Sequence, residues 1–168
     1  MPLLFFLFAL LLIAILYLLI RPIVRGAVYF PTTREAVDSM VGLARPKAGE
    51  RIADLGSGDG RVLMAFARQG IEAHGYEVNP LLVWKSQWAI RRAGLDGKAF
   101  VHWESFWPAN LAEFDIISVY GIPYIMKPLS EKLSRELKPG SRVVSNIYTM
   151  PGWQASEKER SVSLYVRG

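Results

Sequence analysis

The sequence predicts an α/β fold with a mostly parallel, Rossmann-like sheet of about six strands, flanked by helices and preceded by an apolar N-terminal helix. Short apolar runs alternate with segments in which apolar residues recur every three to four positions. One apolar run ends in Asp54 and leads into a loop with glycine at every second position, and a helical pattern follows. The length of 168 residues is enough for one such domain.

The first twenty residues contain no charged side chain, and we predict that residues 1–20 form a transmembrane anchor for a domain spanning residues 21–168. Nineteen helical residues measure about 28 Å, which is close to the thickness of one hydrocarbon core. A buried core helix would have some polar edge, and a cleaved signal peptide would begin with basic residues. Because Arg21 and Arg25 follow the apolar run, the positive-inside rule predicts a single-pass protein of the inner (plasma) membrane with a cytoplasmic domain.

The net charge of +5 and the pI of about 9.6 suit an anionic surface, either lipid or nucleic acid. The chain has no dense Lys/Arg tract, so we expect no nucleic-acid partner. It has no cysteine, which excludes disulfides and thiolate zinc sites. Two isolated histidines, His74 and His102, do not make a metal site, so we also expect no metal.

The loop from Asp54 to Gly60 has the pattern D-x-G-x-G-x-G. The dinucleotide fingerprint G-x-G-x-x-G does not fit, because its third glycine would fall on Arg61. Glu77 closes the next strand-like run, where an acidic residue can accept both ribose hydroxyls of an adenosine. Together these features resemble the S-adenosylmethionine site of the seven-stranded class I methyltransferases. The alternative is a tight strand-to-helix turn with a solvated Glu77.

Two further segments contain candidate cofactor contacts. Thr32 with Glu35 three residues later predicts a capping box, and Thr32 is also a candidate to reach the cofactor. In the class I fold, the position after the third strand hydrogen-bonds the adenine amino group, and Glu104 or Ser105 stands there.

The helix that begins at Asn79-Pro80 has proline at its first position. Trp84 and Trp88 are four residues apart and share one face of this helix. We expect them to pack in the core, and a lipid-facing role is the alternative that the neighbouring basic residues favour.

The fourth strand ends at Tyr120, and Gly121-Ile-Pro123-Tyr124 follows as a turn. Ligands of open parallel sheets lie beyond the carboxyl ends of the strands. We therefore expect Tyr120, Pro123 and Tyr124 to line the methyl-transfer site, although packed aromatics in a plain turn are the alternative. Six strands are expected because the gap between 142–147 and 161–166 is too short for both a helix and another strand, with the last pair antiparallel.

Several segments together resemble the small membrane-anchored lysine methyltransferases that act on the adenine nucleotide translocase or the ATP synthase c-subunit, and their prokaryotic relatives. The matching segments are the apolar N-terminus, Tyr29-Phe-Pro-Thr, Asp54–Arg61, Gly75-Tyr-Glu-Val-Asn-Pro80, Leu82-Val-Trp84, Phe106-Trp107, Tyr120–Pro123 and Trp153.

The resemblance implies that S-adenosylmethionine is held by Asp54, Gly56, Ser57, Gly58, Gly60 and Glu77, with Asn79 nearby. Relatives tend to have aspartate in place of Ser105. The expected activity is methylation of a lysine on a membrane or membrane-associated protein at the lipid bilayer. The alternatives are methylation of a lipid or quinone headgroup, and a non-catalytic membrane-anchored binding module.

Overall fold

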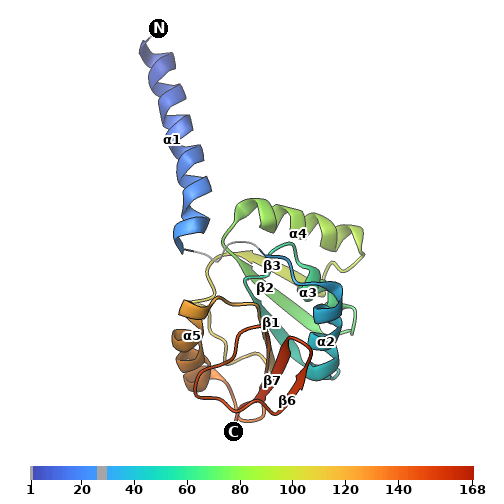
Figure 1. Cartoon of the computed structure of the whole chain (residues 1–168). Coiled ribbons are helices and arrows are strands. Elements are labelled where there is room, and N and C mark those ends of the chain that lie inside the picture. The colour runs from blue at the N-terminus through green and yellow to red at the C-terminus, as the bar shows by residue number, and fades with distance from the viewer. Residues whose placement is uncertain (1, 26–29) are drawn as a thin grey trace.

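The computed structural model describes residues 2–25 and 30–168 and shows an N-terminal helix, α1 (Pro2–Arg25), beside one α/β domain (Figure 1). The predicted anchor and the resemblance segment that starts at Tyr29 therefore fall partly outside the described residues, at Met1 and Tyr29.

The domain is built on one seven-stranded sheet with the order β3-β2-β1-β4-β5-β7-β6. The first five strands of this order are parallel, whereas β7 runs antiparallel to both β5 and β6. The strands are β1 (Arg51–Leu55), β2 (Glu72–Glu77), β3 (Ala99–Trp103), β4 (Ile116–Val119), β5 (Arg142–Asn146), β6 (Glu157–Glu159) and β7 (Val162–Val166).

The prediction of six strands was wrong, and the extra strand is β6. The chain between β5 and β7 forms no helix in the described structure. This leaves room for β6, whose three residues pair with β7. The prediction that the last pair is antiparallel is confirmed.

Helices cover both faces of the sheet. Each strand contributes side chains to both layers because successive strand residues point to opposite sides. Ile52 belongs to the core that contains residues of α2, α3 and α4, whereas the adjacent Ala53 belongs to the core under α5. The helices are α2 (Arg34–Ala44), α3 (Arg61–Ala67), α4 (Pro80–Arg92) and α5 (Pro123–Glu136).

Two helix ends differ from the sequence prediction. Thr33, not Thr32, caps α2, because the Ala36 N–H donates to Thr33 Oγ1 at 3.3 Å. Helix α5 begins at Pro123, so the predicted turn is the first turn of a helix, with proline where its missing N–H costs nothing. Asn79 caps α4 as expected, and its side chain accepts the Leu81 N–H.

Helix α1 carries exposed apolar side chains from Leu4 to Tyr17. Within residues 2–25 and 30–168, no helix combines the length and the apolar content that a bilayer crossing requires. The predicted transmembrane anchor at residues 1–20 is therefore not borne out. The core prediction for two tryptophans was also wrong, because Trp84 is 70% and Trp88 53% exposed.

Candidate functional site

A cavity of about 1020 Å³ lies at the carboxyl ends of β1, β2 and β4, where open α/β sheets bind ligands. Most of the residues singled out from the sequence line it, whereas Gly60 and Pro123 do not. The lining residues predicted from sequence are Thr32, Asp54, Gly56, Ser57, Gly58, Glu77, Asn79, Glu104, Ser105, Tyr120 and Tyr124.

The glycine loop is held against the end of β2 by its own backbone. The N–H groups of Gly56 and Ser57 both donate to the carbonyl oxygen of Tyr76 at 3.0 Å. Gly56, Gly58 and Gly60 all have positive φ, a conformation that only glycine adopts without strain. This geometry brings bare backbone to the cavity wall, where a ligand can approach closely.

Gly60 serves the site indirectly. It caps α3 at φ 80°, and a Cβ added there would stand 2.1 Å from Ser86 Oγ of α4. Absence of a side chain therefore lets α3 start directly after the loop while α4 packs beside it.

Glu77 connects the glycine loop to the start of α4. Its Oε2 accepts the Gly58 N–H at 2.9 Å, and its Oε1 accepts the Asn79 N–H at 2.7 Å. The side chain is buried yet lines the cavity. Each carboxylate oxygen keeps a further lone pair, so Glu77 is able to accept a pair of ligand hydroxyls.

Asp54 is the most perturbed acid of the site. It is buried, and only one of its oxygens is satisfied: Ser118 donates to Oδ1 at 2.6 Å, while Oδ2 has no hydrogen-bond partner among the described residues. Burial, with a smaller contribution from the nearby Glu77 charge, raises the pKa of Asp54 to about 7, and the Ser118 hydrogen bond opposes this rise. A buried carboxylate oxygen without a partner fits a cationic ligand group such as the ammonium of a methionyl moiety.

The aromatic wall of the cavity contains residues that the sequence did not reveal. Tyr120 stands edge-on to Phe30, with ring centroids 6.4 Å apart. Burial and the neighbouring Tyr148 raise the pKa of Tyr120 above its ordinary value, so its hydroxyl stays protonated at neutral pH. Phe30 and Tyr148 both line the cavity. Only the Tyr-Phe-Pro-Thr resemblance could have drawn attention to Phe30.

The remaining predicted residues occupy the rim. Tyr124 is 72% exposed, and Glu104 is exposed as well. Ser105 Oγ accepts the Trp107 N–H at 3.3 Å. Thr32 is buried in the cavity wall, and its carbonyl oxygen accepts a hydrogen bond from Arg61.

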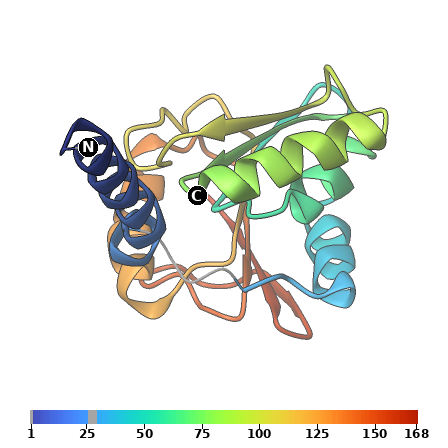
Figure 2. The same ribbon diagram turned by 90° about the horizontal axis from the view of Figure 1, so that it is seen from above.

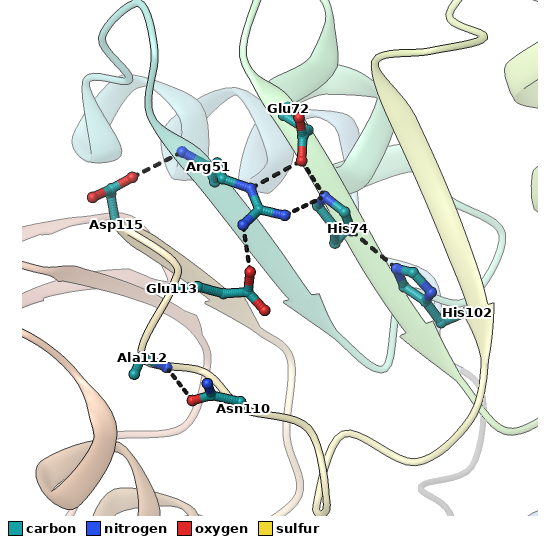
Figure 3. A network of polar contacts seen from close by, with 8 residues as sticks. All are labelled: Arg51, Glu72, His74, His102, Asn110, Ala112, Glu113 and Asp115. Carbon is teal, nitrogen blue, oxygen red and sulfur yellow. Dashed lines mark hydrogen bonds and ion pairs between the residues drawn. The ribbon is translucent and has the colours of Figure 1, made fainter.

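The two histidines lie elsewhere. His74 Nδ1 is 3.0 Å from His102 Nε2, and both rings belong to a polar cluster on strands β2 and β3 (Figure 3). Neither lines the cavity.

The profile of the family described as the ANTKMT methyltransferase domain matches residues 54–157. The chain belongs to this family. The matched region contains the glycine loop, Glu77, Tyr120 and Tyr124, so the family's defining segment and the cavity described above coincide.

Curated proteins that are similar to this chain are named lysine N-methyltransferases. The ATP synthase c-subunit lysine N-methyltransferase of Mus musculus is 37% identical over 125 residues, covering 74% of this chain and 50% of the relative. The adenine nucleotide translocase lysine N-methyltransferase of Mus musculus is 35% identical over 127 residues, covering 75% and 55%. The chain thus spans about half the length of these mammalian relatives. A protein-lysine N-methyltransferase of Saccharolobus islandicus (strain REY15A) is 29% identical over 150 residues, covering 83% of this chain and 93% of the relative.

Among solved structures, an RNA methyltransferase from Salinibacter ruber in complex with S-adenosyl-L-homocysteine superposes with a TM-score of 0.76. It is 28% identical and covers 82% of this chain and 92% of its own. The sheet and helices described here therefore form a class I methyltransferase fold.

Proposed function

We propose that the chain is an S-adenosylmethionine-dependent methyltransferase that methylates a lysine side chain on a membrane or membrane-associated protein. The observation that carries this proposal is the buried Asp54, which lines the cavity and whose Oδ2 has no hydrogen-bond partner among the described residues, beside a glycine loop that is hydrogen-bonded to Glu77. The names of the relatives support lysine as the acceptor.

The cavity offers a complementary group for each part of the cofactor. Glu77 would accept the ribose hydroxyls, and Asp54 would accept a hydrogen bond from the methionyl ammonium. Glu104 and Ser105 also line the cavity, and one of them would accept a hydrogen bond from the adenine amino group. When bound, S-adenosylmethionine supplies a methyl group that is already activated on a sulfonium.

The protein's remaining task is to position a neutral amine. Free lysine has a pKa of about 10.4, and transfer into a dry, aromatic-lined cavity lowers it, because burial disfavours the ammonium. The lysine therefore releases its proton to solvent as it enters the cavity, and the neutral amine is the nucleophile. Tyr120, whose raised pKa keeps its hydroxyl protonated, is unsuited to act as a base. We propose that Tyr120 and Tyr124 form the walls of the acceptor channel. Backbone carbonyls of residues 121–123 would orient the amine.

Tyr120→Phe and Tyr124→Phe test this assignment. Loss of the Tyr120 hydroxyl is expected to lower kcat by up to about tenfold, the size of one lost neutral hydrogen bond of about 1.4 kcal/mol, while the affinity for the cofactor stays unchanged. If both variants keep full turnover, the two hydroxyls take no part in positioning the amine.

We further propose that the protein acts at the cytoplasmic face of the inner membrane, with α1 in contact with lipid. The exposed apolar side chains of α1 support this placement, because soluble proteins seldom expose a continuous apolar surface of this kind. Confinement to the bilayer surface raises the effective concentration of membrane-bound acceptors. Flotation of the full chain with lipid vesicles is the check, and a protein that stays at the bottom of the gradient would contradict it.

Transfer of a radiolabelled methyl group into isolated membranes tests the activity itself. The full chain, with Glu77→Gln as the matched inactive control, is incubated with membranes that are then separated into protein, lipid and RNA fractions. Label in acid-stable N-methyl-lysine of the protein fraction supports the proposal. Label in lipid or quinone would favour the headgroup alternative, label in RNA would assign another acceptor, and absence of both label and cofactor binding would favour a non-catalytic module.

A further inference from the structure

The outward face of α4 is an aromatic and basic surface that, apart from its first residue Leu81, does not line the cavity. Leu81, Trp84 and Trp88 are 68%, 70% and 53% exposed. Arg92 is exposed beside them, and so is Lys85, whose Nζ forms an ion pair with Asp59 at 3.2 Å. The spacing of three to four residues places all five on one side of the helix. We call these residues the α4 face.

The opposite side of the same helix is the one that packs on the sheet. Its buried residues are Val83, Ser86 and Ile90, and α4 contacts strands β2 and β3. The side of α4 with Val83, Ser86 and Ile90 therefore packs on the sheet, and the two tryptophans on the opposite side lie outside the core. A soluble protein has no packing reason to keep two tryptophans on a surface helix.

The chemistry of the α4 face matches one kind of partner. Tryptophan concentrates at the boundary between lipid headgroups and acyl chains, and basic side chains near that boundary attract anionic lipids. Helix α4 has no acidic residue among its thirteen and three basic ones, Lys85, Arg91 and Arg92. Arg92 lies 5.2 Å from the centroid of the Trp88 ring, so cation and aromatic ring form one patch.

The α4 face also lies at the same end of the domain as α1. Helix α4 runs along the end of the domain from which α1 projects (Figure 1), and both helices are nearest the viewer when this end is seen from above (Figure 2). Ile15 of α1 and Leu81 of α4 both line the cavity. Apolar side chains of α1 and of the start of α4 therefore border the same cavity.

We infer that the α4 face rests on an anionic lipid bilayer as a second membrane contact beside α1. The inference builds on the proposed membrane location. One attachment point would leave the orientation of the domain relative to the bilayer undefined. A second contact through α4, which borders the same cavity as α1, holds the cavity close to the lipid surface, where a lysine next to a membrane segment would enter.

The absence of native cysteine allows a direct test on the full chain. Trp88→Cys carries one spin label on the α4 face, and Lys158→Cys carries one on the exposed strand β6 as the matched control. Each labelled protein is bound to vesicles of phosphatidylcholine with phosphatidylglycerol, and collision with oxygen and with a water-soluble nickel chelate is measured. The label at 88 is expected to lose contact with the chelate and gain contact with oxygen, whereas the label at 158 stays accessible to the chelate.

Charge removal gives a second measurement. Arg92→Gln should reduce the dependence of vesicle binding on phosphatidylglycerol, whereas Lys158→Gln, which also removes one exposed positive charge, should not.

A label at 88 that remains in water while the protein floats with vesicles would overturn the inference and leave the proposed methyltransferase intact. A label that becomes immobilised without lipid, in proportion to protein concentration, would assign the α4 face to a second copy of the chain. Failure of the whole protein to bind vesicles would remove the proposed membrane location together with this inference, while cofactor binding in detergent would still report on the methyltransferase separately.

Discussion

Strands β1 and β2 carry charged residues at both of their ends, and the two ends are arranged in opposite ways. At the amino end, Arg51 forms salt bridges with Glu72 and Glu113, and its backbone N–H donates to Asp115 (Figure 3). At the carboxyl end, Asp54 and Glu77 line a cavity, and no salt bridge among the described residues contains either of them.

The difference separates structural charge from binding charge. The Arg51 cluster is partly exposed and contains both signs, so its members satisfy one another. Exposed pairs of this kind contribute little to stability. The carboxyl end is acidic, buried and incompletely satisfied, and burial of an unpartnered polar atom costs free energy unless a ligand pairs with it. Incomplete satisfaction, not the presence of charge, marks the binding site.

Glu77→Gln should show the largest effect. The amide would place an N–H group against the N–H of Gly58 or Asn79, which both donate to the present carboxylate. We expect the Kd for S-adenosylmethionine, measured by calorimetry, to rise about 100-fold, as expected for loss of charge-assisted hydrogen bonds. Glu72→Gln is the matched control at the other end of the same strand and should change Kd by less than about twofold. Equal effects of the two substitutions would contradict the comparison.

Gly60→Ala should destabilise the carboxyl end through the backbone. The added Cβ meets Ser86 Oγ and the residue needs φ 80°, so the free energy of unfolding should fall by about 2 kcal/mol. Gly49 has a similar φ of 85° but no atom within 4 Å of its added Cβ. Gly49→Ala, which isolates the conformational strain, should cost about 1 kcal/mol. Chemical denaturation of both variants separates the two contributions, and indistinguishable values would rule out the Ser86 collision.

The pKa of Asp54 predicts how binding depends on pH. Because a cationic ligand prefers the ionised carboxylate, and the pKa of Asp54 is about 7 in the free protein, affinity should rise about fivefold from pH 6 to pH 7. The ammonium of the ligand stays mostly protonated over this pH range, because the pKa of an ordinary α-amino group lies above it. Asp54→Asn should bind more weakly and remove the slope. A wild-type affinity that is flat over this range would show that Asp54 does not face the cationic group.

The same shift predicts stability in the absence of ligand. The pKa of folded Asp54 lies above its ordinary value of 3.8, so the folded state binds more protons than the unfolded state between these values. The favourable contribution of protonated Asp54 to the free energy of unfolding is therefore fully present below about pH 4 and is lost as the pH rises through about 7. Comparison of wild type with Asp54→Asn by thermal unfolding across this range isolates the contribution of this residue. A difference that stays constant with pH would contradict it.

Glu113→Gln should show the smallest effect. Glu113 is half exposed and shares Arg51 with Glu72 and with the ring of Phe114. The free energy of unfolding should change by less than about 1 kcal/mol, and methyl transfer should not change. A large loss of activity would mean that the amino end of the sheet contributes to the site after all.

The sequence predicted the parts of the site that are local in the chain. The glycine loop, Glu77 and the Asn79 cap lie within one strand–loop–helix segment and the strand that follows it, where the spacing of residue types decides the geometry. Ser118 shows what a local pattern cannot give. It is 64 residues from Asp54 and reaches it only because β1 and β4 pair with Asp54 opposite Ser118.

The errors in the fold have the same origin. Periodicity places Trp84 and Trp88 on one face of α4, but it does not say whether the sheet covers that face or the opposite one. Strand β6 has only three residues, and its pairing with β7 depends on the hairpin between them and not on an apolar pattern. Thr32 and Thr33 are equally good N-caps by composition, and tertiary contacts place Thr32 in the cavity wall instead.

Calorimetric titration of the detergent-solubilised full chain with S-adenosyl-L-homocysteine near pH 7 tests most directly whether the carboxyl end of β1 and β2 is a cofactor site. We expect saturable binding of one molecule per chain that weakens as the pH falls to about 6. Glu77→Gln should weaken this binding about 100-fold, whereas Glu72→Gln should retain it. Folded protein that releases no binding heat at any pH in this range would contradict the assignment of this end of the sheet to the cofactor.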